Sequence, residues 1–309
     1  MTDQDKLKSF NEQNGTKIKI EDKNISLDQK EINESSLIKL LSINFQNLES
    51  LYLNHLSLNN LSFLSSTHFP LLQKLSLDDN NIKSLNGISI LKVNNLSELS
   101  IQRNKLESID ELSKVDLPNL KRLSLSMNNI KSIDILPKTN FLNLEYIYLN
   151  DNQIPSIDGL CLAPFSKLKH FNFNCNKIKS IDSLEKAPFT NIQGIYLVEN
   201  EIENIEVFGK VNFKNLKDLS LNGNKISSIN VFTKVNFVDL ESLDIEYNQI
   251  SNIDAFENLP FTKLNHLGLR NNKLDKDDEK VKNVVSKLEK KYEGISVIIS
   301  QSERGPLGC

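Results

Sequence analysis

The sequence predicts an α/β repeat solenoid, in which a parallel β-sheet covers one side and short helical or 3₁₀ turns cover the other. The first observation is a unit of eleven residues, and its copy at Leu216 to Ile226 reads L-K-D-L-S-L-N-G-N-K-I. Ten copies follow one another at intervals of 24 residues, starting at Leu48, Leu72, Leu96, Leu120, Leu144, Leu168, Ile192, Leu216, Leu240 and Leu264. A fixed period of this length is typical of stacked repeats that form one continuous body.

The second observation is the spacing of apolar residues within each copy. Two of them, such as Leu219 and Leu221, lie two positions apart and therefore point to the same side of a β-strand. We expect one short strand in every copy, with consecutive strands parallel and side by side. An asparagine follows the strand in nine copies, at Asn80, Asn104, Asn128, Asn152, Asn176, Asn200, Asn224, Asn248 and Asn272. We interpret this column as structural, because an amide can satisfy buried backbone groups of the loops.

The third observation is the composition of the connectors between the strands. A phenylalanine such as Phe165 recurs in most of them, and prolines such as Pro164 flank it and disfavour long helices. We therefore expect the apolar connector residues to join the core and the turns to be short. Aspartates such as Asp110 and Asp158 stand where they could act as N-caps of these turns.

The two ends of the chain depart from the period. We expect residues 1–15 to be disordered or a short polar segment, and residues 16–47 to form an N-terminal capping repeat with a strand at Thr16 to Ile20. The array itself spans residues 48–275. Residues 276–300 should close it with a helix and a strand, because Val281, Val284 and Leu288 share one helical face. We expect residues 301–309 to be a disordered tail.

Composition argues against several classes of function. The net charge is −3, which gives no global basic field for nucleic acid or an anionic membrane. No apolar run is long enough for a transmembrane helix, and the polar N-terminus does not resemble a signal peptide, so we expect a cytoplasmic protein. The four histidines and three cysteines lack the spacing of a metal site. We expect no catalytic residues, no enzymatic activity, no cofactor and no metal.

The pattern L-x-x-L-x-L-x-x-N-x-I-x-x-I, as in Leu120 to Ile133, resembles the leucine-rich repeat. Its continuation, Ile-x-x-Ile-Asp-x-Leu, resembles the short intracellular class typified by the protein-phosphatase-regulating leucine-rich repeat proteins. Repeats of 24 residues and a different C-terminal end depart from that class. The resemblance implies a horseshoe with a concave parallel sheet, and a binding role for the concave face.

The distribution of tyrosine on the expected concave face suggests where a partner binds. Tyr146, Tyr148 and Tyr196 fall in three successive copies at the middle of the array, with His170 among them. Tyrosine is enriched in interface hot spots, although it is also common in strands for its β-propensity alone. Acidic residues dominate the later copies of the same face. The predicted partner-binding residues are Tyr146, Tyr148, His170, Asn172, Tyr196, Val198, Met127, Arg122, Asp218, Asp244 and Glu246.

These observations favour a non-enzymatic scaffold that is a monomer on its own and binds a protein or peptide on the concave face. We expect neither a nucleic-acid nor a membrane partner. Two alternatives remain open from the sequence. One is a regulatory subunit of a protein phosphatase or another enzyme, and the other is a structural spacer in a larger assembly.

Overall fold

In the computed structural model of the protein, every copy of the repeat contributes one strand of three residues, and the strands of the ten copies begin 24 residues apart, as predicted. The structure describes residues 2–28, 31–66, 69–91, 93–295 and 297–299. The chain divides into two units. Unit 1 comprises the described residues up to Tyr148 together with Ala163–Phe165, and unit 2 comprises Leu149–Leu162 and the described residues from Ser166 onward.

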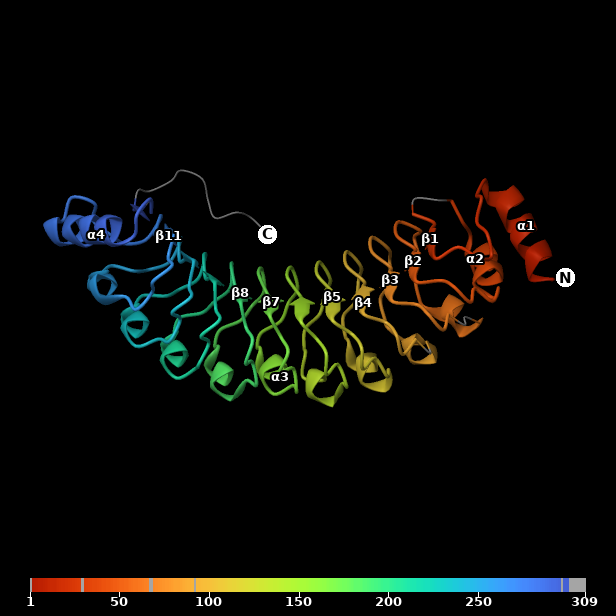
Figure 1. Ribbon diagram of the computed structural model, residues 1–309, viewed down its shortest axis with the longest axis horizontal. Helices are drawn as coiled ribbons and strands as arrows, with labels where there is room; N and C mark the ends of the chain where they lie inside the picture. The colour runs from red at the N-terminus through yellow and green to blue at the C-terminus, as the bar shows by residue number, and fades with distance from the viewer. Residues whose placement is uncertain (1, 29–30, 67–68, 92, 296, 300–309) are drawn as a thin grey trace. The chain divides into compact units, whose positions relative to one another are not determined.

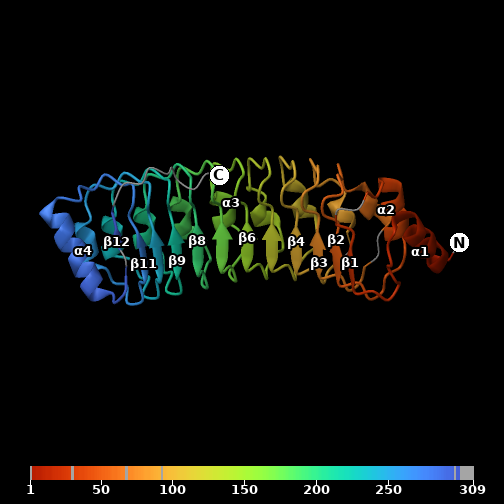
Figure 2. The same cartoon turned by 90° about the horizontal axis from the view of Figure 1, so that it is seen from above.

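Within each unit the strands are parallel and lie side by side in chain order (Figures 1 and 2). The buried leucines set the register, since Leu219 pairs with Ile195 on one side and with Leu243 on the other. Unit 1 contains β1 (Asn24–Ser26), β2 (Ser50–Tyr52), β3 (Lys74–Ser76), β4 (Glu98–Ser100), β5 (Arg122–Ser124) and β6 (Tyr146–Tyr148). Unit 2 contains β7 (His170–Asn172), β8 (Gly194–Tyr196), β9 (Asp218–Ser220), β10 (Ser242–Asp244), β11 (His266–Gly268) and β12 (Val297–Ile298).

Short turns cover the side of each unit opposite the strands, as the prolines of the connectors predict (Figure 1). The 3₁₀ turns of unit 1 are η1 (Ser62–Ser66), η2 (Ile88–Ile90), η3 (Asp110–Lys114) and η4 (Leu136–Lys138). Unit 2 has α3 (Asp158–Cys161), η5 (Asp182–Lys186), η6 (Glu206–Gly209), η7 (Asn230–Thr233) and η8 (Asp254–Asn258). The phenylalanine column lies in the core between strands and turns, where Phe165 and Phe237 are fully buried.

The aspartates that begin several turns do not act as N-caps, so this prediction is wrong. Asp110 is the first residue of η3, and its own N–H donates to the Ser108 hydroxyl at 3.1 Å. The same bond joins Asp158 to Ser156 and Asp182 to Ser180. The side chain that satisfies the first N–H of the turn is therefore that of the serine two residues earlier, and no side-chain cap bond is present at the start of these turns.

The first strand also lies elsewhere than the sequence predicts. Thr16 to Ile20 alternates polar and apolar residues but forms no strand, and Ile18 and Ile20 are only half-buried. The strand is β1, in which Ile25 pairs with Leu51, and Ile25 and Leu27 are 2% and 0% exposed. The strand forms where its apolar side chains are fully buried against the next copy, as Ile25 and Leu27 are. Ile18 and Ile20 would gain less free energy because they stay half-exposed.

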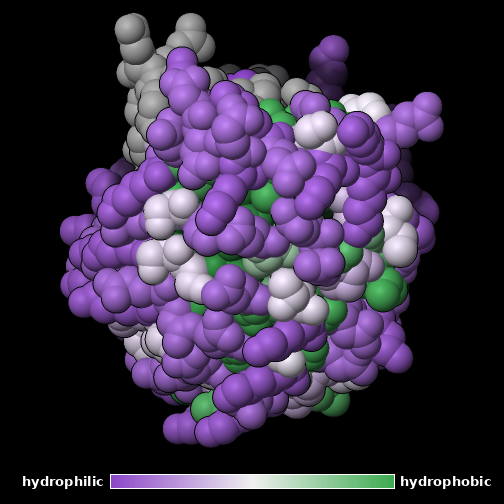
Figure 3. Space-filling view, turned by 90° about the vertical axis from the view of Figure 1, so that its left-hand side faces the viewer, coloured by the Kyte–Doolittle hydropathy of each residue, from purple (hydrophilic) through white to green (hydrophobic). Residues whose placement is uncertain are grey.

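Helices stand at both ends of the chain. In unit 1, α1 (Asp3–Asn14) begins with a capping box at Thr2 and Asp5 and buries Leu7 and Phe10, and α2 (Glu34–Leu41) follows. In unit 2, α4 (Glu279–Lys291) buries Val281, Val284 and Leu288, and β12 pairs with β11. The surface at the α4 end is mainly hydrophilic (Figure 3). At each end of the array a helix, α1 in unit 1 and α4 in unit 2, presents a polar outer face where a further repeat would otherwise be needed to cover the core.

The asparagine column joins each copy to the one before it, as we interpreted it. In unit 2 the Asn224 amide donates to the carbonyls of Leu197 at 2.9 Å and Leu221 at 3.0 Å, and its oxygen accepts the Ile202 N–H at 3.0 Å. All nine asparagines are between 4% and 9% exposed. Within a unit, an amide of this column such as that of Asn224 therefore satisfies buried backbone groups of two successive copies.

We expect Asn224→Ala to lower the free energy of unfolding by about 1–3 kcal/mol, because it leaves buried backbone donors and acceptors without partners. Urea denaturation followed by circular dichroism measures the change. Asn236→Ala is the matched control, since Asn236 is exposed and donates to the Asn212 side chain at 2.9 Å. Equal shifts of the two midpoints would show that the column is not what holds successive copies together.

Candidate functional site

The candidate site is the strand face, which we define as the surface formed by the strand side chains that alternate with the buried leucines. In β9, for example, Asp218 and Ser220 are half-exposed on either side of the buried Leu219. This is the face predicted to bind a partner. The predicted residues Arg122, Met127, Tyr146 and Tyr148 belong to unit 1, and the remaining seven belong to unit 2. Each unit is therefore described by itself.

In unit 1 the strand face brings Arg122 together with Tyr146 and Tyr148. The Arg122 guanidinium lies 4.4 Å from the centroid of the Tyr146 ring and 5.3 Å from that of Tyr148. Its Nη1 also donates to the Tyr148 hydroxyl at 2.8 Å. A cation over two aromatic rings is held by cation–π attraction, and the hydrogen bond fixes its orientation. We call these three residues the arginine–tyrosine cluster.

The other charges on the strand face of unit 1 are paired. Lys74 lies 2.9 Å from Glu98, and Arg103 lies 3.7 Å from Asp79. The Asp78 carboxylate accepts the Ser100 hydroxyl and the Gln102 N–H, both at 2.7 Å. No carboxylate lies within ion-pair distance of Arg122 among the described residues. Unlike Lys74 and Arg103, this cation therefore has no ionic partner there.

In unit 2 the sequence-predicted residues His170 and Tyr196 come together across a glycine. Their rings are stacked, with centroids 6.3 Å apart and an angle of 12° between the planes. Both lean over Gly194, because a Cβ at that position would lie 2.4 Å from His170 Nδ1 and 2.9 Å from the Tyr196 hydroxyl. The absence of a side chain at Gly194 therefore permits the pair.

Four carboxylates lie on the strand face of unit 2, at Glu199, Asp218, Asp244 and Glu246. Burial raises the pKa of Glu199, of Asp218 and of Glu246. Neighbouring carboxylates add to this effect, with Glu241 raising the pKa of Asp218 and Asp244 raising that of Glu246. The Arg270 Nε lies 3.7 Å from Glu246 Oε1, which is a loose contact. We call these four residues the acidic surface.

Glycines of the strand face also set the position of two of these carboxylates, which the sequence reasoning missed. A Cβ on Gly223 would lie 2.2 Å from Glu199 Oε1, and one on Gly268 would lie 2.2 Å from Asp244 Oδ1. Each carboxylate thus folds onto the backbone of the next copy. A signal for this was present in the sequence, because the other copies have a side chain at the positions that Gly194, Gly223 and Gly268 occupy.

A second polar column of the strand face is structural. The side-chain oxygens of Asn54, Asn174 and Asn222 each accept an N–H from the copy that follows, at 2.7 to 2.9 Å. Two of the predicted residues lie beside this column. Asn172 ends β7 and accepts the Asn174 N–H, and Val198 donates its N–H to Asn174. The Val198 bond therefore joins two successive copies, whereas the Asn172 bond orients Asn174 within one copy.

The residue before each column asparagine has a left-handed backbone. Met127, for example, has φ of 56° and is 44% exposed at the edge of the strand face. The same conformation occurs at His55, Asp79, Arg103, Met127, Asp151, Cys175, Glu199, Gly223, Tyr247 and Asn271. Only one of these residues is glycine, although the conformation is unfavourable for all others.

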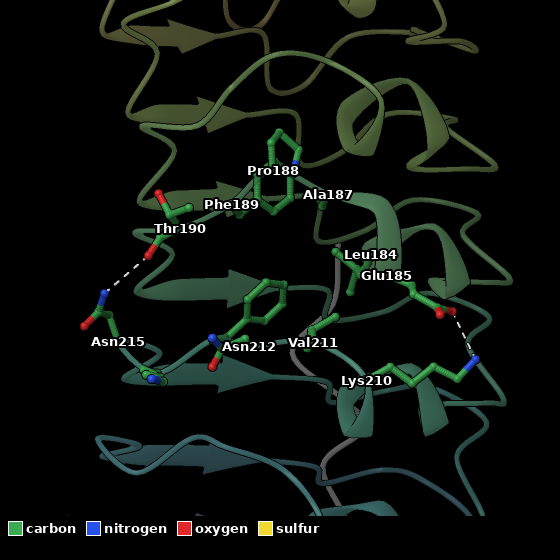
Figure 4. A pocket seen from close by; sticks show the side chains of 12 residues that line it. Leu184, Glu185, Ala187, Pro188, Phe189, Thr190, Lys210, Val211, Asn212 and Asn215 are labelled. Atoms are coloured by element: carbon green, nitrogen blue, oxygen red, sulfur yellow. Dashed lines mark hydrogen bonds and ion pairs between the residues drawn. The ribbon is translucent and has the colours of Figure 1, made fainter.

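A cavity of about 460 Å³ lies away from the strand face of unit 2, between the connectors that precede β8 and β9 (Figure 4). Its labelled polar side chains interact with one another, since Lys210 lies 3.0 Å from Glu185 and Asn215 donates to the Thr190 carbonyl at 3.4 Å. With these groups already engaged, the cavity offers a weaker binding site than the strand face.

Other kinds of site find no support in the described part of the chain. No group of three or more histidine, cysteine, aspartate or glutamate side chains there is placed to hold a metal ion. None of the helices described above has the length and apolar character that crossing a membrane requires. Cys161 is buried, and burial raises the pKa of its thiol to about 12, which disfavours the thiolate.

Sequence comparison agrees with the repeat read from the columns. A family model described as leucine rich repeat matches residues 70–130 and 214–274, and a second, described as leucine rich repeats in two copies, matches residues 118–161 and 142–186. The chain is a leucine-rich repeat protein. Its resemblance to the phosphatase-regulating class is not confirmed, and no curated protein sequence matches it.

Solved structures share the leucine-rich repeat fold at low identity. An internalin, InlF, from Listeria monocytogenes is 22% identical with a TM-score of 0.69, and the match covers 91% of this chain and 82% of that one. The ectodomain of the plant receptor kinase GASSHO1/SCHENGEN3 from Arabidopsis thaliana, solved with CASPARIAN STRIP INTEGRITY FACTOR 2, is 21% identical with a TM-score of 0.63, covering 90% and 36%. A TLR13–ssRNA13 complex is 24% identical with a TM-score of 0.62, covering 77% and 34%.

We expect Met127→Gly to be more stable than Met127→Ala by about 0.5–1 kcal/mol. Glycine removes a left-handed strain of about 1–2 kcal/mol and costs about 0.5–1 kcal/mol in chain entropy. Thermal and urea denaturation of the two variants measure the difference. At the control position Lys131, which does not share this backbone conformation, alanine should be the more stable residue. The same order at both positions would contradict the prediction.

The acidic surface predicts a pH-dependent stability difference. Because the folded pKa values of Glu199, Asp218 and Glu246 are raised, protonation favours the folded chain, and stability contributed by these groups increases as pH falls through those values. The variant Glu199→Gln/Asp218→Asn/Glu246→Gln should therefore be more stable than wild type at pH 7. Its advantage should shrink as pH falls toward the ordinary values of 3.8 and 4.5.

Urea midpoints measured between pH 7 and the acid range check this prediction. The variant Asp182→Asn/Glu203→Gln/Glu206→Gln, on exposed positions of the turn side, controls for the change in net charge. An advantage of the strand-face variant that does not change with pH would contradict the assigned cause.

Proposed function

We propose that this leucine-rich repeat protein is a non-enzymatic interaction scaffold that binds a protein or peptide on its strand face. The arginine–tyrosine cluster of unit 1 is the observation that carries the proposal. Tyrosine and arginine are the residues most enriched in interface hot spots, together with tryptophan, which this chain lacks. The turn side has no comparable cluster among the described aromatic contacts.

Preorganisation supports the same conclusion. A free arginine side chain loses rotamer entropy when a partner immobilises it, and that loss weakens binding. In unit 1 the two rings and the Tyr148 hydroxyl already hold the Arg122 guanidinium in the unbound protein. A carboxylate of the partner that reaches Arg122 would thus meet a cation that needs little further ordering.

The histidine–tyrosine stack of unit 2 is the second part of the proposed surface. His170 and Tyr196 present flat rings over Gly194, and an aromatic pair of this kind supplies contact area with few rotatable bonds. Whether one partner occupies both parts is a matter for the experiment below. The cytoplasmic location and the monomeric state stay predictions from the sequence.

A nucleic-acid partner is less compatible with these surfaces. A similar fold occurs in the TLR13–ssRNA13 complex, so the fold itself does not exclude RNA. Binding of a phosphate backbone needs a stripe of lysine and arginine. Here the cations of unit 1 are mostly paired with carboxylates, and the face of unit 2 carries the acidic surface.

We expect Tyr146→Ala/Tyr148→Ala to weaken partner binding by about 30-fold or more, since hot-spot residues contribute about 2 kcal/mol or more each. Affinity purification with wild-type and variant protein identifies the partner and compares its recovery. Tyr52→Ala is the matched control, because Tyr52 occupies the same strand position as Tyr148 on β2 of the same unit.

Recovery must be compared at equal folded content, checked by circular dichroism. A partner recovered equally with wild type and the double variant would overturn the assigned surface. A co-purified partner with catalytic activity would favour the regulatory-subunit alternative, in which the same face contacts an enzyme.

A further inference from the structure

The strand face of unit 2 carries an excess of negative charge that the rest of the protein does not repeat. Its acidic surface contains the four carboxylates of Glu199, Asp218, Asp244 and Glu246, and the one guanidinium beside them is that of Arg270. Three of these carboxylates have a pKa raised by burial, so water solvates them less than it would on an open surface.

On the strand face of unit 1, where negative charge is not in excess, the carboxylates have close partners. There Glu98 pairs with Lys74 at 2.9 Å, and Asp78 accepts two hydrogen bonds at 2.7 Å. In unit 2 no hydrogen bond or ion pair within the described residues reaches the Asp218 carboxylate, and the Glu246–Arg270 contact is 3.7 Å long. The fold can pair such charges closely, as it does in unit 1, and on the strand face of unit 2 it leaves Asp218 unpaired and Glu246 only loosely paired.

Two oxygens of the acidic surface are inaccessible to water and lack a donor. Glu199 Oε1 and Asp244 Oδ1 have no hydrogen-bond partner in the described part of the chain. The other oxygen of Asp244 accepts from the Asn222 amide at 2.5 Å. Glycines Gly223 and Gly268 underlie the two orphan oxygens, so the geometry that buries them is built into the sequence. An orphaned buried acceptor is a cost that a donor from a partner would remove.

The histidine–tyrosine stack borders this surface. His170, Gly194 and Asp218 are in register on three adjacent strands, which places the imidazole ring and the carboxylate on the strands either side of Gly194. An aromatic face beside a carboxylate suits a lysine or arginine side chain, since the ring attracts the cation and the carboxylate pairs with it.

We infer that the acidic surface of unit 2 docks an extended segment of a partner protein through lysine or arginine side chains. The inference deepens the proposed function, on which it rests for the use of the strand face. It names the chemistry of the partner segment, which is basic where it contacts β8 to β11. The bound ammonium or guanidinium groups would pair with the half-exposed carboxylates of this surface, such as Asp218, which has no side-chain hydrogen bond or ion pair among the described residues.

The arrangement favours a peptide over a metal ion. The carboxylates are distributed over β8, β9 and β10, and neighbouring strands are about 4.8 Å apart. A metal ion needs its oxygen ligands within about 2.0–2.6 Å, and no such group is present among the described residues. Side chains on one side of an extended peptide repeat every 6.5–7 Å or so, which matches separate contacts across several strands.

The test uses the full chain and a fluorescein-labelled peptide of alternating arginine and serine, followed by fluorescence anisotropy. We expect this peptide to bind, and the same peptide with glutamate in place of arginine not to bind. The variant Asp218→Asn/Asp244→Asn/Glu246→Gln should weaken binding about tenfold, equivalent to about 1.4 kcal/mol. The turn-side variant Asp182→Asn/Glu203→Gln/Glu206→Gln removes the same charge and should change binding by less than about twofold.

Equal binding by wild type and the strand-face variant would overturn the inference, as would equal weakening by both variants, which would indicate only net charge. Spermine that displaces the peptide at the same molar concentration would overturn the commitment to a peptide. The proposed function fails separately, when the partner purified with wild type is retained by Tyr146→Ala/Tyr148→Ala. If Tyr146→Ala/Tyr148→Ala loses that partner, and the strand-face variant still binds the arginine peptide as tightly as wild type does, the inference is overturned and the proposed function stands.

Discussion

The hydrogen bonds of the asparagine column are the contacts on which the rest of the structure depends. A strand of three residues has too little ladder to stabilise itself, and the chain leaves it through a loop whose backbone groups are buried. Asn200 shows the solution, since its amide donates to the Phe173 carbonyl of the preceding copy at 2.9 Å and its oxygen accepts the Ile178 N–H at 3.0 Å. Without these bonds the loops would bury unsatisfied groups at every copy, at about 1–3 kcal/mol for each group.

This structural demand also decides which positions can carry function. The inward asparagine, the buried leucines and the second polar column at Asn174 and Asn222 are all committed to stacking. The two strand positions on either side of the buried leucine, and the left-handed residue at the edge, are left free to vary. The arginine–tyrosine cluster and the acidic surface consist of residues at such positions, except that Glu246 occupies the second column, where this copy has a glutamate in place of asparagine.

The sequence predicted the array well because its period is exact in length and each column has one physical role. It placed the strand of every copy, the turns opposite them and the stacking role of Asn224. It failed at the N-terminus, where Thr16 to Ile20 alternates as convincingly as β1 does, because alternation cannot tell whether a neighbour is present to bury Ile25. It also assigned the turn caps to aspartates such as Asp110, although serines recur with the same 24-residue period two positions earlier, at Ser108, Ser132, Ser156 and Ser180.

Less of the candidate site could be predicted, because side-chain direction on a strand face depends on the neighbouring copies. Tyr146, Tyr148 and Arg122 could be placed on one face by spacing alone, but their mutual contacts at 4.4 Å and 5.3 Å could not. The carboxylates could be counted, but their burial could not be foreseen. That burial follows from residues with no side chain at all, Gly223 and Gly268.

The glycines explain both why the acidic surface destabilises the unbound protein and why it would attract a cation. A carboxylate that folds onto glycine backbone loses water from one oxygen, which raises the pKa of Glu199 and leaves its Oε1 without a donor. The same loss of water lowers the local dielectric, so that a cation near this carboxylate is attracted more strongly than it would be by a fully solvated one. A side chain at Gly223 would push the carboxylate outward, stabilising the free charge and weakening its attraction for a cation. The positions of the glycines therefore raise the free energy of the unbound strand face of unit 2 and strengthen its binding of a basic partner.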